Sequence, residues 1–357
     1  MTRSTVRRLL RIGGVLLIIL LALYALAWAA FADVRYITRA ALAEADILRR
    51  RRPIASVVAD SSTDPTVRGR LLLVLAARAF AADSLGLTAG ETYTTYSALD
   101  RDTLVLVLSA ARSDTLAPYT WTYPVVGRFP YKGFFTLAAA QREADQLERA
   151  GLDIYIRPAS AFSTLGWFND PLLSTALRAD SADLAATVIH ELLHNTLFVK
   201  DRVTFNESFA EFVGYRGAEA FFRSRGDSAN ADRTVLRWRD EQLLAEFYAN
   251  LVEQLNKVYA SGATPQEMRR ARAALFDQAR DRMAGQLASQ LRTISGRRLA
   301  ERPLNNAVVL AMRVYATGLD RFDSLLVRQG GDVRRTVAYV KENVERFEDP
   351  WEVLAVR

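Results

Sequence analysis

The two histidines of this chain stand four residues apart, in the pentapeptide His190-Glu191-Leu192-Leu193-His194. No other histidine occurs among the 357 residues. On an α-helix, positions i and i+4 lie on one face, so both imidazoles can reach a single ion with bonds of about 2.0 to 2.1 Å. The glutamate between them then lies beside the metal. This pattern predicts a zinc peptidase, and the alternative is a pair of ordinary core or surface histidines.

A catalytic zinc needs a third protein ligand and an open position for water. Glu207 is the first acidic candidate on a second helix, and we predict Asn206 as the N-cap of that helix, because apolar residues follow at near-helical spacing. Twelve residues separate His194 from Glu207. We therefore expect a tight helix-loop-helix, with Lys200 and Asp201 forming the turn.

The sequence around these residues resembles the gluzincin metallopeptidases, in which the third ligand is a glutamate of a second helix. The string HELLHNTLFVKDRVTFNESFAEFVGY, residues 190–215, is similar to the bacterial Putative aminopeptidase family of that clan. Three more stretches agree: WTYPVVGRFPYKGFF (121–135), STLGWFNDP (163–171) and LNNAVVLAMRVY (304–315). The resemblance covers most of the chain after the first fifty residues. It implies aminopeptidase activity, with His190, His194 and Glu207 as ligands and Glu191 as the general base.

The same residues define a mechanism on chemical grounds. Zn²⁺ held by two histidines and a glutamate lowers the pKa of a bound water and polarises the substrate carbonyl. Glu191 would take the proton of that water and deliver it to the departing amine. The developing oxyanion needs a second donor, and a tyrosine or asparagine must serve because no histidine is left. Tyr315, which follows Asn305 and Asn306, is the first candidate; the alternative is a half-buried aromatic without a catalytic role.

Glu211 stands four residues after Glu207 and so shares its helical face. In some gluzincins an acidic residue at this offset accepts a hydrogen bond from a zinc-bound imidazole, so the resemblance implies that Glu211 fixes the orientation of His190. We place Glu211 in this supporting shell, together with Asn206. A solvated surface acid and a substitute metal ligand are the alternatives for Glu211.

The N-terminus predicts a membrane anchor. Four arginines before residue 12 precede an uncharged apolar stretch of twenty-one residues, from Ile12 to Ala32. At about 1.5 Å per residue, such a helix spans a hydrocarbon core of about 30 Å. The arginines should stay cytoplasmic, which gives a single-pass protein of the bacterial inner membrane with its catalytic domain in the periplasm. Trp28, near the outer end, fits an interfacial aromatic belt.

A cleavable signal peptide is the competing interpretation, because Ala30-Phe31-Ala32 has the small-x-small form of a cleavage site. The chain would then be secreted to the periplasm. The apolar core of a signal peptide usually has about 7 to 15 residues, which favours the anchor. Many relatives of the resembling family look like lipoproteins, but this chain has no cysteine to acylate, so it does not share their mode of anchoring.

Charge and cysteine content limit the partners. Of the formal net charge of +7, four positive charges come from the arginines before residue 12, so the remainder does not indicate nucleic-acid binding. The absence of cysteine excludes disulfides, thiol catalysis and cysteine-bound zinc. The basic run Arg49 to Arg52 reads as a solvated helix end before Pro53.

These motifs need a scaffold, which we predict to be α+β: a mainly helical zincin-like metallopeptidase domain with a small β-sheet, preceded by an N-terminal transmembrane helix. The basic tip and signal-anchor occupy residues 1–35, and the extracytoplasmic domain occupies 36–357. The metal helices lie within 181–225. The C-terminal helical part covers 228–350, with segments near 232–260, 264–294, 303–328 and 331–347.

Local patterns before the metal helices predict further elements. Helices are expected over 36–52, 65–85 and 136–150, the last one ended by Gly151. Strands are expected over 103–109, 121–128 and 153–157. Peptidases often hold an extended peptide against a sheet edge, and Asp153 to Arg157 is the predicted edge. Gly166 would permit close backbone approach and Trp167 would wall a side-chain pocket, whereas Phe168 reads as core.

Two functions follow as hypotheses. The first is a zinc-dependent peptidase that acts outside the cytoplasm on peptides or unfolded proteins. The second is a membrane-tethered, non-catalytic scaffold that retains a structural zinc. Structural zinc sites usually have four protein ligands, and no fourth ligand of cysteine or histidine type exists here, which favours the enzyme. No sequence signal identifies the acid that an aminopeptidase needs to hold the substrate ammonium group.

Overall fold

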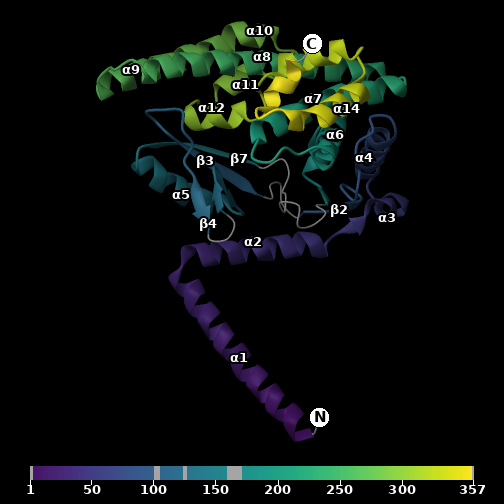
Figure 1. The fold of residues 1–357 in the computed structure, drawn as a ribbon, viewed down its shortest axis with the longest axis vertical. Coiled ribbons are helices and arrows are strands. Elements are labelled where there is room, and N and C mark those ends of the chain that lie inside the picture. Colours follow the sequence, from purple (N-terminus) through teal and green to yellow (C-terminus); the bar gives the residue numbers. More distant parts are fainter. Residues whose placement is uncertain (1–2, 100–104, 124–126, 159–170, 356–357) are drawn as a thin grey trace. The chain divides into compact units, whose positions relative to one another are not determined.

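The computed structural model describes residues 3–99, 105–123, 127–158 and 171–355 (Figure 1). The chain divides into two compact units, one formed by residues 1–50 with 123–127 and one formed by 51–122 with 128–357. The described chain is mostly helical with small sheets, which confirms the mainly helical α+β prediction. Three small sheets are present in this part of the chain, where one was predicted.

The first unit contains two helices, α1 (Arg3–Ala30) and α2 (Ala32–Arg49). The 21 residues Leu10–Ala30 have a mean hydropathy of 2.5 and are unburied, so this helix is long and apolar enough to cross a membrane or to be a signal sequence. The Arg35 guanidinium donates to the carbonyl oxygens of Trp28 at 2.9 Å and Ala29 at 2.8 Å, which satisfies the end of α1. The second helix begins four residues earlier than predicted and ends at Arg49, the first residue of the basic run.

The second unit begins with a sheet of order β1-β2-β8, made of Arg52–Pro53, Thr95–Ser97 and Leu172–Leu173. Helices α3 (Ile54–Ala59) and α4 (Pro65–Asp83) follow β1, and α4 matches the helix predicted over 65–85. Asp64 caps α4 by accepting from the backbone N–H groups of Thr66 and Val67, and Pro65 occupies the first turn, where its missing N–H costs nothing.

A second sheet has the antiparallel order β6-β3-β7, with β3 at Leu106–Arg112, β6 at Tyr131–Phe134 and β7 at Leu152–Pro158. The predicted strand over 153–157 is therefore confirmed, and it is an edge strand. Helix α5 (Leu137–Arg149) contacts all three strands, begins at the cap Thr136 and ends before Gly151, which has a φ of 82°.

The single strand predicted over 121–128 is wrong. Two short strands, β4 (Trp121–Tyr123) and β5 (Gly127–Phe129), pair with each other there. Gly127 has a φ of 96°, a conformation that favours glycine and is incompatible with one continuous strand. The strand predicted over 103–109 is also displaced, since β3 runs from residue 106 to 112.

The metal motifs lie on α6 (Ser181–Thr196) and α7 (Val203–Ser224), which occupy the segment predicted for them. Asp201 has a φ of 59° and forms the turn between them, as predicted. Asn206 is not the N-cap of α7, because that helix begins four residues earlier, after Arg202. The Asn206 side chain is buried and instead accepts from the N–H of Val199 at 2.9 Å and donates to its carbonyl at 2.7 Å. It pins the connecting loop, and Glu207 lies in the second helical turn.

The two helices cross closely at two glycines of α7. A Cβ atom added at Gly214 would lie 2.8 Å from the carbonyl oxygen of Ala186 and 3.3 Å from the Cβ of His190. At Gly217 it would lie 3.0 Å from Ile189. Buried phenylalanines on the other side of α7 pack in stacked pairs, Phe209 and Phe212 each with Phe322.

The C-terminal part is helical, as predicted. Its helices are α8 (Ser228–Tyr259), α9 (Pro265–Arg282), α10 (Ala288–Gln290), α11 (Gly296–Ala300), α12 (Asn306–Arg313), α13 (Leu319–Arg328) and α14 (Val333–Asn343). Three short helical turns also belong to this part, at Met283–Leu287, Val344–Arg346 and Pro350–Leu354, and another, at Ala176–Arg178, precedes α6. The continuous segment predicted over 303–328 breaks between α12 and α13, because Gly318 has a φ of 61° and a Cβ there would meet the ring of Trp351 at 2.7 Å.

Replacing Gly214 with alanine should destabilise the fold, because the added methyl group meets backbone that cannot move aside. We expect a loss of about 1 to 3 kcal/mol in the free energy of unfolding, measured by denaturant titration of the detergent-solubilised chain. Gly69→Ala is the matched control, since Gly69 is also helical but has open space around it, so alanine should stabilise there. Equal stability of the two variants would contradict the close crossing.

Candidate metal centre

The imidazoles of His190 and His194 meet on one face of α6. Their Nε2 atoms lie 3.2 Å apart and the rings are nearly perpendicular, at 84°. The Glu207 carboxylate approaches from α7, with Oε2 at 3.3 Å from Nε2 of His190 and Oε1 at 3.6 Å from Nε2 of His194. Three donor atoms from two helices therefore converge on one point, as the sequence predicted.

These separations fit one metal ion. Ligand atoms about 2.0 to 2.1 Å from a tetrahedral Zn²⁺ lie about 3.3 Å from one another. The observed values of 3.2, 3.3 and 3.6 Å match that spacing. Within the described residues this is the one group of three histidine or acidic side chains placed to hold a metal. The centre also has the mixed nitrogen and oxygen donor set that zinc accepts.

The remaining ring nitrogens of the two histidines have different surroundings. Nδ1 of His190 lies 3.3 Å from Oε2 of Glu211, so the structure brings the predicted supporting carboxylate to this ring. Nδ1 of His194 is buried and has no hydrogen-bond partner in the part of the chain that the structure describes. Glu211 thus contacts one histidine, while the orientation of the other depends on packing, including an edge-on contact with Phe198 at 6.4 Å.

The electrostatics favour a cation at this point. Burial lowers the pKa of His190, but the hydrogen bonds to Glu207 and Glu211 outweigh it and raise that pKa to about 10. Burial raises the pKa of Glu207, yet the two histidines lower it to about 2. The Glu207 carboxylate therefore stays ionised at neutral pH, and its negative charge attracts either a proton or a metal ion.

Tyr315, the predicted oxyanion donor, is 37% exposed and follows Val314, whose carbonyl accepts from the hydroxyl of Ser208, next to Glu207, at 3.4 Å. Burial of the Tyr315 hydroxyl raises its pKa, and the charges of Glu207, Glu211 and Glu191 raise it further. Glu191 directly follows His190 on α6, and its charge raises the pKa of both His190 and Tyr315. None of the described ion pairs involves Glu191, so its carboxylate is not held by a cationic side chain.

The sequence did not single out two other aromatic residues at this centre. Burial raises the pKa of Tyr131, and the charge of Glu207 raises it further, so this hydroxyl lies within electrostatic reach of the metal group. Phe198, beside His194, is 63% exposed. Tyr131 lies inside the aromatic stretch 121–135 that carries part of the family resemblance. The sequence of a β-strand does not show which distant residues its side chains approach in the fold.

The other predicted site residues have separate positions. Both hydrogen bonds of the Asn206 side chain go to Val199, so Asn206 supports the loop and no described bond links it to a metal ligand. Gly166, Trp167 and Phe168 lie outside the described residues.

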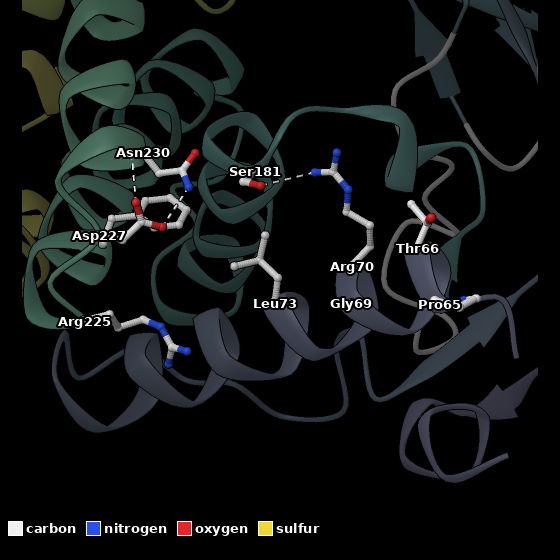
Figure 2. A pocket seen from close by; sticks show the side chains of 10 residues that line it. Pro65, Thr66, Gly69, Arg70, Leu73, Ser181, Arg225, Asp227 and Asn230 are labelled. Carbon is white, nitrogen blue, oxygen red and sulfur yellow. Dashed lines mark hydrogen bonds between the residues drawn. The ribbon is translucent and has the colours of Figure 1, made fainter. Parts of the chain in front are cut away.

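A shallow hollow lies at the opposite end of α6, where Ser181 begins that helix (Figure 2). Arg70 donates to the Ser181 hydroxyl at 3.4 Å, and Asp227 is occupied in capping α8 through Asn230. Ser181 is nine residues before His190, or about 13 Å along a helix. The hollow is therefore distinct from the metal centre.

Comparison with known proteins identifies the family. Residues 35–349 match the family model described as Putative aminopeptidase, so the chain belongs to this family. Membership indicates a peptidase. A search of curated proteins found no match, and a search of solved structures found none either.

Replacing Glu207 with alanine should remove one of three ligands, so we expect the purified variant to contain far less metal than the wild type, measured by elemental analysis. Glu211→Ala should retain the three ligands but weaken metal affinity about 10- to 100-fold, because the orientation of His190 is lost. If Glu207→Ala kept its metal and Glu211→Ala lost it, Glu211 would be the third ligand instead.

Proposed function

We propose that this protein is a zinc-dependent peptidase of gluzincin type, in which His190, His194 and Glu207 hold the ion. The observation that carries the proposal is the convergence of three donor atoms at separations of 3.2 to 3.6 Å in a member of an aminopeptidase family. The two-helix centre beside a small antiparallel sheet supports a zincin-like assignment of the fold. Aminopeptidase activity is part of the proposal.

When bound, zinc supplies a Lewis acid for the scissile carbonyl and an activated water. Glu191 is the proposed general base: it receives the proton of the attacking water and passes it to the leaving amine. Its position beside the ligands, without an ion-pair partner in the described part, leaves it free to do so. Glu211 keeps His190 in one orientation and one tautomer throughout.

Tyr315 and Tyr131 are the proposed donors to the developing oxyanion. Their raised pKa values keep both hydroxyls protonated at neutral pH, so each can donate a hydrogen bond. A fixed donor in a site with little water stabilises negative charge more strongly than solvent does. The proposal thus adds Tyr131 to the role predicted for Tyr315 alone.

The substrate is proposed to lie along the outer edge of β7. Ala110 uses its carbonyl for Tyr119, so the opposite residue, Ile154, directs its own carbonyl outward, where Asn305 donates to it at 2.9 Å. Alternation then directs the backbone groups of Ile156 outward as well, and no described strand pairs with them. An extended peptide can add there. Gly166 and Trp167 remain proposed flanking contacts.

The proposed setting is the periplasmic face of the bacterial inner membrane. The apolar helix α1 would be the single-pass anchor, with residues 36–357 as the extracytoplasmic domain and peptides or unfolded proteins as substrates. Secretion after signal cleavage is the alternative. The competing function, a scaffold with structural zinc, is less well supported because such sites usually close with four protein ligands. The described metal group has three.

Glu191→Gln should keep the metal and lose turnover, because a neutral amide cannot accept the water proton. We expect cleavage of a peptide library, read by mass spectrometry with and without chelator, to fall about 10²- to 10⁴-fold. Glu148→Gln, an exposed position on α5, is the control that should cleave normally. Undiminished, chelator-sensitive cleavage by Glu191→Gln would exclude this residue as the base. In the wild type, the products show the mode of action: removal of N-terminal residues indicates an exopeptidase, and internal cleavage indicates an endopeptidase.

Tyr315→Phe and Tyr131→Phe should each lower kcat with unchanged metal content, by about 10²- to 10³-fold for a hydroxyl that donates to the oxyanion. KM should change little, because the bond strengthens only in the transition state. Tyr339→Phe, a partly buried tyrosine of the core, is the matched control. A variant that retains full kcat identifies a tyrosine that does not serve as the donor.

A further inference from the structure

Arg157 lies near the end of β7, opposite Val107 of β3. Side chains alternate between the two faces of a strand, so Asp153, Tyr155 and Arg157 share one face of this sheet. The buried side chain of Ile154 belongs to the opposite face, the one with Leu108, and helix α5 packs against these strands. Arg157 therefore points away from that buried row.

The contacts of its two neighbours show what this face meets. Asp153 pairs with Arg272 of α9 and accepts from the backbone N–H of Asn306 of α12 at 2.8 Å. Tyr155 packs against the hydrophobic cluster that contains Val308 of α12. The face that carries Arg157 is thus covered by α12, and Tyr315 follows two residues after that helix ends.

Arg157 lies on the sheet face that α12 covers, and the segment after α12 contacts α7: the Ser208 hydroxyl, next to Glu207, donates to the carbonyl of Val314 at 3.4 Å. The positive charge of Arg157 lowers the pKa of both Tyr131 and Tyr315, whereas the charge of Glu207 raises it. The strand register also places Arg157 near Tyr131. Tyr131 and Tyr155 both pair with Ser109, and the next cross-strand row on the same face is the one that contains Val107 and Arg157. Arg157 is accordingly a cation beside the proposed oxyanion donors.

Among the residues that the structure describes, this cation has no acidic partner. Arg157 is half-buried, and no carboxylate within the described residues forms an ion pair with it. Other arginines of the same unit are paired, Arg272 with Asp153 and Arg216 with Asp323. Holding a partly desolvated guanidinium without a counter-charge is unfavourable, so its position indicates that an anion arrives from outside.

We infer that Arg157 binds a carboxylate of the substrate, placed beside the scissile bond on the edge of β7. A guanidinium matches a carboxylate in a planar, bidentate arrangement. The carboxylate can come from an aspartate or glutamate side chain or from the C-terminus of a short peptide. This inference rests on the proposed peptidase function and adds substrate preference to it: peptides with a negative charge near the cleaved bond are favoured.

The test uses the full-length, metal-loaded protein and a set of peptides of equal length. One peptide is neutral with an amidated C-terminus, one has a free C-terminal carboxylate, and a third group is amidated with one glutamate placed at each position in turn. The variants are Arg157→Met and Arg157→Lys. Arg149→Met, at an exposed arginine at the end of α5, is the matched control.

Wild type and Arg149→Met should prefer the peptides with a carboxylate. Arg157→Met should lose about 10- to 100-fold in kcat/KM on those peptides, mainly through KM, and change less than about twofold on the neutral peptide. Arg157→Lys should recover part of the loss, because it restores the charge without the bidentate geometry. The favoured peptide identifies which carboxylate is bound, and the preference should weaken at high salt.

A binding measurement separates this inference from the proposed chemistry. In the Glu191→Gln background, isothermal titration should show the same loss of affinity for the favoured peptide when Arg157→Met is added. If Arg157→Met instead slows all peptides equally, the guanidinium acts on Tyr131 and Tyr315, and the inference is overturned. If the wild type cleaves without preference, it is likewise overturned. If no peptide is cleaved, the proposed function fails, and the titration alone decides whether Arg157 binds a carboxylate.

Discussion

The metal centre depends on how closely α6 and α7 approach each other. Glu207 and Glu211 can reach the two ring nitrogens of His190 because no side chain stands between the helices at Gly214. The loop that joins the helices is short, its turn is set by Asp201, and the buried amide of Asn206 holds it at Val199. The geometry of the ligands is therefore fixed by backbone packing, before any metal contributes to it.

Charge is distributed unevenly around this centre. The acids come from the two metal helices, whereas the tyrosines and Arg157 come from the sheet and from the segment after α12. The acids favour a cation, whereas the tyrosines and Arg157 offer hydroxyl donors and a positive charge to an electron-rich carbonyl or carboxylate. A substrate that contacted both groups would meet potentials of opposite sign, which would orient it as well as bind it.

The sequence predicted the parts of the site that depend on local spacing. His190, His194 and Glu207 converge as expected because helical periodicity and a short loop leave few other arrangements. Asn206 was misassigned because a polar residue before an apolar run resembles a cap, and only the tertiary contact with Val199 shows its place. Tyr131 was not predicted as a site residue, and Arg157 was predicted only as the end of the substrate edge, because the positions of their side chains depend on strand register. Registers join residues far apart in the chain, which composition and periodicity do not encode.

The hydrogen bond from Asn305 to the carbonyl of Ile154 limits the length of β7 edge that a substrate could use. This bond occupies one backbone carbonyl on the outer edge of β7 and leaves the backbone groups of Ile156 available to a substrate strand. A substrate strand bound at the proposed site could pair over only a few residues before it met α12, which contacts β7. The proposed site would therefore accept unfolded chain ends or exposed loops and exclude intact folded domains.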